Sequence, residues 1–248
     1  MQTRASPPVY VISLDRTADR YASFLARNAH LGEIARARAV DGDALDRADL
    51  CARGLLQPDA AYSSGALGCA LSHACVWQIV AGQDAPSIVA EDDAVFRHDF
   101  DAAAARVVAG LPADWDLVLW GWNFNSILCI DLLPGITPCA LAGDQVQLRR
   151  NIARFQDGRA PAMPLRLLRA HGSAAYSVSP AGAAKLLRLC LPIRRADVFF
   201  PVVNRITPND GIDMMMSLVY PQMQAFVSFP PLAVTENRRD LSTIRGRQ

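Results

Sequence analysis

The feature that most constrains the fold is a series of short apolar runs, each separated from the next by a stretch with helical spacing. The runs are VYVISL at 9–14, SIVA at 87–90 and WDLVLWGW at 115–122. Short apolar runs of this kind, in which Asp116 is the single charged residue, suit the strands of a parallel sheet that is covered on both faces. Their alternation with helices predicts an α/β fold.

The most informative helical stretch is 65–82, which follows Ser63 and Ser64 and contains no Asp, Glu, Lys or Arg. Apolar side chains recur in it at helical spacing. A helix without charge on any face is largely buried. Its polar members Ser72 and His73 are therefore expected to face a partner or a cleft.

A further helix is expected to begin at Thr17, a residue type that caps helices, and to reach about Asn28. Its inner face carries Tyr21, Phe24 and Leu25. Residues 123–164 are predicted to be loop with at most one helix, because Pro and Gly are scattered through them. The remaining predicted elements are strands at 35–40 and 224–229, helices at 100–109 and 181–190, and a short helix at 209–220 that begins near Asn209 or Asp210.

Composition favours one large folded domain. The chain has 248 residues, of which 51% are hydrophobic, so it can bury a large core. We expect a single domain at 1–240 and a polar tail at 241–248. The net charge of +1 gives no general attraction to nucleic acid or to anionic lipid.

Cysteine usage and the N-terminus bear on the cellular compartment. The 6 cysteines form no CxxC pair and show no metal-ligand spacing with histidine, which predicts buried, reduced thiols. The N-terminal apolar run is too short for a signal peptide, and no membrane-spanning stretch is expected later in the chain. A soluble, cytoplasmic protein is therefore the expectation.

Three adjacent carboxylates, Glu91, Asp92 and Asp93, follow the apolar run at 87–90. Two unit charges about 6 Å apart repel by roughly 0.7 to 3 kcal/mol, so solvent, helix N-terminal amides, arginine or a divalent cation must offset the cost. In an extended chain Glu91 and Asp93 point to one side and Asp92 to the other. This favours a pair of carboxylates over a cluster of three. The alternative is that Asp92 or Asp93 only begins a turn or caps the next helix.

Five segments carry a resemblance to a known family. They are YVISLDRTADR from 10, RARAVDGDAL from 36, GALGCALSHACVWQIV from 65, IVAEDDAVF from 88 and HGSAAYSVSPAGAAKLL from 171. In this order and spacing they resemble glycosyltransferase family 25, which includes lipooligosaccharide and procollagen galactosyltransferases. NDGIDMMM, from 209, is a weaker match. Ser13, where the family usually has asparagine, and the stretch 123–164 depart from the pattern.

The resemblance implies a GT-A-like fold, with a donor-binding half at about 1–125 and an acceptor half at about 126–240. It also implies transfer of a hexose, often galactose from UDP-galactose, to a hydroxyl of a glycan. A divalent cation, Mn²⁺ or Mg²⁺, would bridge Asp93 and the donor diphosphate, with Glu91 as a second ligand. Inversion at the sugar also needs a base, for which Asp213 is the first choice and Asp210 the second.

The residues predicted to bind the donor lie mainly at strand ends, where α/β proteins bind ligands. The predicted partners are a UDP-sugar and a glycan or lipid-linked glycan acceptor, with no nucleic acid. A lipid-linked acceptor leaves peripheral membrane contact open, through the arginines near Arg149, Arg150 and Arg154. The predicted donor-binding set is Ser13, Leu14, Asp15, Arg20, Asp41, Ser72, His73, Glu91 and Asp92.

These assignments have structural alternatives. Asp210 can cap a helix, Asp213 can pair with an arginine on a helix surface, and His73 can be a buried histidine bonded to a carbonyl. For the whole protein, a family member that binds nucleotide or glycan without turnover is a second hypothesis. A phospho-acceptor receiver domain is a third, disfavoured because the chain is too long and lacks the expected later strand that bears a lysine.

Overall fold

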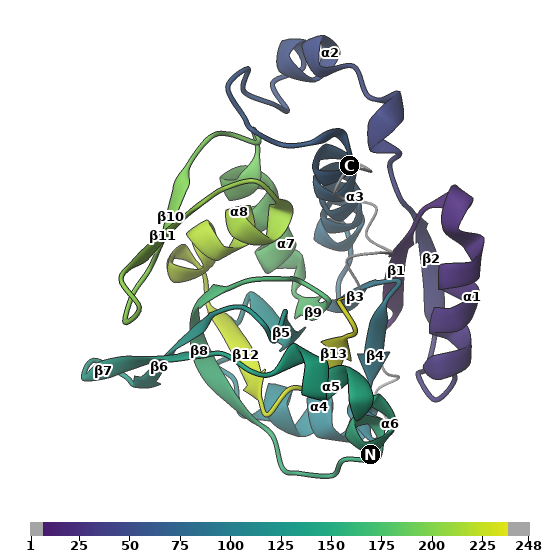
Figure 1. The fold of residues 1–248 in the computed structure, drawn as a ribbon, viewed down its shortest axis with the longest axis vertical. Coiled ribbons are helices and arrows are strands. Elements are labelled where there is room, and N and C mark those ends of the chain that lie inside the picture. Colours follow the sequence, from purple (N-terminus) through teal and green to yellow (C-terminus); the bar gives the residue numbers. More distant parts are fainter. Residues whose placement is uncertain (1–6, 238–248) are drawn as a thin grey trace.

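A nine-stranded sheet lies at the centre of the molecule, in the order β2-β1-β3-β9-β5-β12-β8-β6-β7 (Figure 1). The structure is a computed structural model, and residues 7–237 are described. Two small antiparallel sheets pair β10 with β11 and β4 with β13. The strands are β1 (Val9–Ser13), β2 (Ile34–Arg38), β3 (Ser87–Glu91), β4 (Ala94–Phe96), β5 (Leu117–Gly121), β6 (Leu128–Leu133), β7 (Thr137–Leu141), β8 (Met163–Ala170), β9 (Ala175–Val178), β10 (Asp197–Phe200), β11 (Arg205–Pro208), β12 (Ala225–Phe229) and β13 (Ala233–Thr235).

The centre of the sheet is mostly parallel. Strand β1 pairs in parallel with β2 and β3, and β5 pairs in parallel with β12. Strand β9 lies antiparallel between β3 and β5. Because β2, β1, β3, β5 and β12 run in one direction, their carboxyl ends meet at the same edge, where the antiparallel β9 begins. The predicted α/β fold is confirmed.

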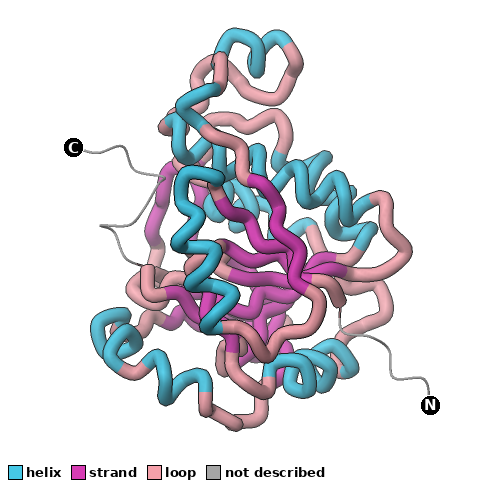
Figure 2. The backbone as a smooth tube through the Cα atoms, turned by 90° about the vertical axis from the view of Figure 1, so that its right-hand side faces the viewer, coloured by secondary structure: helices cyan, strands magenta, loops and turns pink. Residues whose placement is uncertain are grey.

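Helices cover both faces of the sheet (Figure 2). Alternate strand residues enter two separate cores, as the period of two requires. Val89 and Leu119 pack in the core that contains α3 and α7, whereas Ile88 and Val118 pack with α1 and α4. The helices are α1 (Ala18–Arg27), α2 (Arg47–Ala52), α3 (Ser64–Ala81), α4 (Phe100–Ala109), α5 (Gln145–Arg150), α6 (Ile152–Gln156), α7 (Pro180–Cys190) and α8 (Ile212–Val219), with short 3-10 turns η1 (Asp15–Thr17), η2 (Gly42–Ala44) and η3 (Tyr220–Gln222).

Capping side chains set two helix boundaries where the sequence predicts them. The Ser63 hydroxyl accepts a hydrogen bond from the backbone N–H of Ala66 at 3.1 Å and begins α3. The Ser179 hydroxyl accepts from Gly182 at 3.0 Å and begins α7, with proline as the first helical residue. Helix α4 has the predicted bounds.

Three local predictions are wrong. Helix α1 begins after Thr17 and ends before Asn28 as predicted, but the Thr17 hydroxyl donates to the Leu14 carbonyl at 3.1 Å and does not cap the helix. Leu25 is 37% exposed, whereas Phe24 carries the buried face of α1. Residues 123–164 contain the hairpin β6–β7, helices α5 and α6 and the start of β8. Exposed edge strands and very short helices carry too little apolar periodicity to be recognised.

Within residues 7–237, one helix, α3, has the length and hydropathy of a membrane span. Its mean hydropathy is 1.3 over 18 residues. The sequence-based expectation that no such stretch exists is thus wrong by these two criteria. However, 56% of the helix is buried inside the protein, and Leu67 and Trp77 lie in the main core. A core helix has the same composition, in agreement with the burial predicted for this segment.

Backbone contact fixes α3 against the loop that follows β2. A Cβ atom on Gly68 would lie 2.6 Å from the Val40 carbonyl oxygen, and one on Gly42 would lie 1.8 Å from that of Ser64. The Ser72 hydroxyl accepts from the backbone N–H of Val40 at 2.8 Å. Glycine is required at both positions because no side chain fits between these backbones.

Substitution of Gly68 by alanine should therefore destabilise the protein by about 1–3 kcal/mol, the usual cost of overpacking. Gly82→Ala is the matched control, because a Cβ there meets its nearest neighbour at 3.6 Å. The control should stay within about 0.5 kcal/mol of the parent protein. Urea unfolding measures both, and equal stability of the two variants would contradict the close approach.

Candidate active site

A cavity of about 1120 Å³ opens at the edge of the sheet where β1 and β3 end. Helix α1, the first half of α3, the segment before β9 and the beginning of α8 form part of its walls. Its polar lining residues include Ser13, Arg20, Ser72, Glu91, Asp92, Asp93, Asn123, His171, Ser173, Arg205, Asp210 and Asp213. The cavity thus collects most of the acidic residues that the sequence singles out.

Asp92 is the inward-facing member of the acidic triplet. Its side chain is 8% exposed and forms an ion pair with Arg20 of α1. Its other oxygen accepts from the hydroxyl of Ser13, at the end of β1, at 3.0 Å. Burial raises the pKa of Asp92, and the Arg20 charge opposes that shift. Asp92 therefore ties together two strand ends and a helix.

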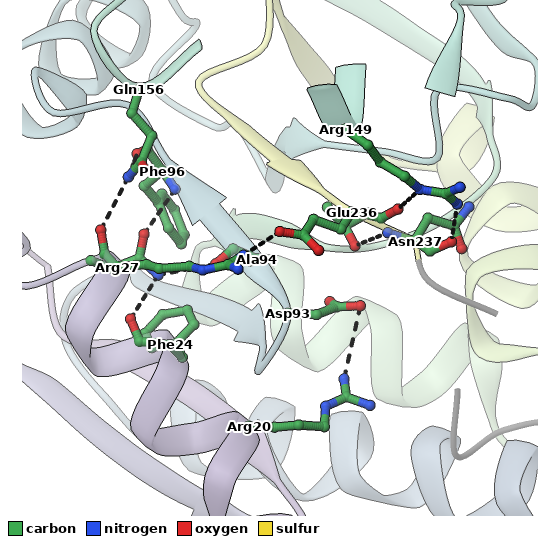
Figure 3. A network of polar contacts seen from close by, with 12 residues as sticks. Arg20, Phe24, Arg27, Asp93, Ala94, Phe96, Arg149, Gln156, Glu236 and Asn237 are labelled. Carbon is green, nitrogen blue, oxygen red and sulfur yellow. Dashed lines mark hydrogen bonds and ion pairs between the residues drawn. The ribbon is translucent and has the colours of Figure 1, made fainter. Parts of the chain in front are cut away.

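Asp93 turns toward the cavity instead. Arg20 points toward it (Figure 3), with 3.8 Å between the guanidinium Nη2 and Asp93 Oδ2. The second oxygen, Oδ1, is buried and has no hydrogen-bond partner within the described residues. A buried carboxylate oxygen without a donor costs about 1–3 kcal/mol or more. A ligand that supplies positive charge or a donor would remove this cost.

Glu91 is the last residue of β3 and shares the cavity with Asp93. Its pKa is raised to about 8, first by burial and then by the negative charge of Asp93. The Ser173 hydroxyl donates to Glu91 Oε1 at 3.0 Å, which offsets part of this shift. Burial and the charge of Asp93 thus both favour the protonated form of Glu91 in the ligand-free protein.

Asp213 lies in the first turn of α8 and lines the same cavity. Its Oδ2 accepts from the backbone N–H of Gly172 at 2.8 Å. Burial raises its pKa, and the Gly172 hydrogen bond opposes the shift. No ion pair with arginine involves Asp213 within residues 7–237, so the alternative of a surface pair is wrong.

Asp210 is exposed at the cavity, and it does not cap α8. The N-cap residue is Gly211, without a side-chain cap. Asn209, the other predicted start of this helix, is buried and accepts from the Tyr62 hydroxyl at 2.6 Å. Asn209 therefore positions the loop that carries Asp210.

The predicted donor-binding residues divide into two groups. The cavity lining includes Ser13, Leu14, Arg20, Ser72, Glu91 and Asp92. His73, Asp15 and Asp41 are not part of it. Asp15 pairs with Arg36 at 3.0 Å and Asp41 with Arg16, whose hydrogen bond lowers the pKa of Asp41. We therefore assign no donor contact to Asp15 or Asp41.

Sequence reasoning missed one wall of the cavity, at 235–237. Figure 3 shows Arg27 paired with Glu236, and Arg149 donating to the backbone carbonyls of Glu236 and Asn237. Gln145 donates to the Thr235 carbonyl at 2.9 Å. Backbone carbonyls accept most of these bonds, and carbonyl acceptors leave no pattern in a sequence. Arg149, predicted as part of a membrane-facing patch, is engaged here.

The acidic residues have the donor atoms that a hard cation prefers. Within residues 7–237, no group of three or more His, Cys, Asp or Glu side chains is placed to hold a metal ion. Glu91 and Asp93, with the orphaned Asp93 Oδ1, nevertheless fit a cation whose remaining ligands are diphosphate oxygen and water. Two carboxylates suffice when a substrate supplies the other ligands.

A comparison with family profiles decides the relationship. The profile of Glycosyltransferase family 25 (LPS biosynthesis protein) matches residues 6–202. The chain belongs to glycosyltransferase family 25. The matched region contains the whole acidic triplet and most of the cavity lining, whereas Asp210 and Asp213 lie beyond it.

Animal relatives of this family 25 protein match over most of its length. "Inactive glycosyltransferase 25 family member 3" of Mus musculus is 29% identical over 245 residues, covering 91% of this chain and 36% of the mouse protein. The Homo sapiens protein of the same name is 28% identical over 221 residues, covering 82% of this chain and 32% of its own. The chain thus spans about a third of the length of these relatives.

The Glu91 shift predicts how stability depends on pH in the ligand-free protein. A carboxyl whose pKa is about 8 in the folded protein and 4.5 for an ordinary glutamate binds more protons folded than unfolded. It therefore destabilises the fold progressively as pH rises between these values. Glu91→Gln should be increasingly more stable than the parent from pH 5 to pH 8 in urea unfolding. Parallel pH profiles would contradict the raised pKa.

Proposed function

We propose that this family 25 protein is a metal-dependent, inverting glycosyltransferase that moves a hexose from a UDP-sugar to a hydroxyl of a glycan. The observation that supports this best is the presence, in one cavity, of an orphaned carboxylate oxygen on Asp93 and the half-buried carboxyl group of Asp213. The Asp93 oxygen can bind the cation of the donor diphosphate. The Asp213 carboxyl group can accept the proton of the acceptor hydroxyl.

The donor side of the proposal rests on the edge formed by β1 and β3. Glu91 and Asp93 would hold a divalent cation, Mn²⁺ or Mg²⁺, which when bound neutralises diphosphate charge as UDP leaves. Arg20 lines the same region and can donate to phosphate oxygen, whereas the hydroxyls of Ser13 and Ser72, which donate to Asp92 and to the Gly68 carbonyl, can only accept from the donor. Asp92 is bonded to Ser13 and Arg20 and keeps this group in place.

The acceptor side rests on α8. Asp213 lines the cavity, and the Gly172 amide fixes its Oδ2 with a hydrogen bond of 2.8 Å. Burial raises the pKa of Asp213, and a raised pKa makes the ionised carboxylate a stronger base. Asp210, which is exposed at the cavity, is the second choice.

The substrate details of the proposal come from the family. We infer galactose from UDP-galactose as the donor group, and assembly of lipopolysaccharide or another surface glycan as the setting, because the profile carries the description LPS biosynthesis protein. A cytoplasmic location, with peripheral contact to a lipid-linked acceptor, belongs to the same proposal.

A second function is favoured by the relatives, which are named inactive. In that case the protein binds nucleotide or glycan without transfer. Incubation with UDP-sugars, Mn²⁺ and an acceptor panel separates the two. Release of UDP supports the enzyme, whereas saturable UDP-sugar binding without any release supports the binding protein.

Asp93→Asn should lower the rate of UDP release by about 100-fold or more, because the amide keeps the shape but loses the charge that holds the cation. Asp114→Asn, at an exposed position, is the control and should leave the rate unchanged. A coupled assay for UDP measures both. An unchanged rate in Asp93→Asn would argue against a metal site at this residue.

Asp213→Asn should reduce transfer by about 10²–10⁴-fold, the range contributed by a positioned base. Donor affinity should stay within about twofold, because Asp213 acts on the acceptor. Asp210→Asn is the matched comparison and should retain most of the activity. A larger loss in Asp210→Asn than in Asp213→Asn would exchange the two roles.

A further inference from the structure

Next to Glu91 lies a chain of three buried side chains that the proposed function does not use. Trp77 and His73 are one turn apart on α3, and Tyr176 lies in β9. All three residues are 0% exposed. The Trp77 indole Nε1 donates to the Tyr176 hydroxyl oxygen at 2.7 Å, and that oxygen lies 2.8 Å from His73 Nδ1.

The proton positions in this chain follow from which groups can donate. Indole N–H only donates, so the Tyr176 oxygen accepts from Trp77. The Tyr176 hydroxyl proton then needs an acceptor, and Nδ1 of His73 is within reach. Because Nδ1 accepts this proton, it carries none of its own. A neutral ring that accepts at Nδ1 carries its proton on Nε2.

The chain ends at Nε2 of His73 without a partner. This atom is fully buried and makes no hydrogen bond to the described part of the protein. It lies 3.9 Å from Glu91 Oε1, which is beyond hydrogen-bond range. The Ser173 hydroxyl already donates to the same oxygen at 3.0 Å. Two donors therefore face Oε1 of Glu91, and Oε2 receives no hydrogen bond from residues 7–237.

We propose that His73 is a positioning residue for Glu91. With its tautomer set by Trp77 and Tyr176, the Nε2–H closes onto Glu91 Oε1 when the site is loaded, so that Oε2 is held toward the cation and donor. The inference rests on the proposed function, because the loaded site is the reason to position Glu91. The sequence predicts that His73 binds the donor directly. We propose instead that His73 acts through Glu91, because His73 is not part of the cavity lining.

Two amide substitutions separate the two ring nitrogens. An asparagine amide reaches the place of Nδ1, whereas a glutamine amide reaches that of Nε2 and can still donate to Glu91. His73→Asn should weaken Mn²⁺ binding, measured by calorimetry with UDP present, by about tenfold or more. His73→Gln should recover most of that loss. Binding of UDP without metal should be equal in all proteins.

Tyr176→Phe is the second variant, because it removes the hydroxyl that sets the tautomer and leaves His73 in place. This substitution should also weaken Mn²⁺ binding, by several-fold. If His73→Asn fails to fold, Tyr176→Phe alone tests the proposed role of His73. Equal Mn²⁺ affinity in the parent protein and the folded variants overturns the inference. An equal loss in His73→Asn and His73→Gln also overturns it. If the parent protein binds neither UDP nor Mn²⁺, the proposed function itself fails.

Discussion

The ion pair between Arg20 and the buried Asp92 holds together the elements on which the cavity depends. Arg20 comes from α1, Asp92 follows β3, and Ser13, which donates to Asp92, ends β1. A carboxylate with an 8% exposed side chain is tolerated only with such partners, because burial without them costs several kcal/mol. This contact fixes where the next residue, Asp93, and the preceding residue, Glu91, are directed.

Each of the three adjacent carboxylates thereby has a different environment. Asp92 is satisfied by the protein, Asp93 has an orphaned oxygen, and Glu91 has a pKa of about 8. The last two are unfavourable in the ligand-free protein, and the cation of the proposed function would make them favourable. These two carboxyl groups lower the stability of the fold, whereas the uncharged helix α3 and the core it shares with α7 raise it.

Much of this arrangement can be predicted from the sequence. Period-two and uncharged apolar runs mark β1, β3 and β5, and Ser63 and Ser179 mark helix starts, because burial and capping act locally. The contact between Ser13 and Asp92 spans 79 positions and leaves no local pattern.

The features that the sequence failed to predict also depend on contacts that leave no local pattern. The wall at 235–237 is held through backbone carbonyls, and the separation of His73 from the cavity depends on how β9 packs against α3. Asp15 and Asp41 lie near strand ends as predicted, but nearby arginines engage them outside the cavity lining. Position at a strand end is thus not sufficient for a place in the cavity lining, because side-chain partners also decide where a carboxylate is directed.

Diffraction from crystals soaked with UDP and Mn²⁺ tests the central claim most directly, since manganese scatters anomalously. The account predicts one anomalous peak within about 2.3 Å of an Asp93 carboxylate oxygen, with diphosphate oxygens as further ligands. It also predicts a Glu91 oxygen facing that peak. A nucleotide bound in the cavity without metal at Asp93, or metal bound at another group of carboxylates, would contradict it.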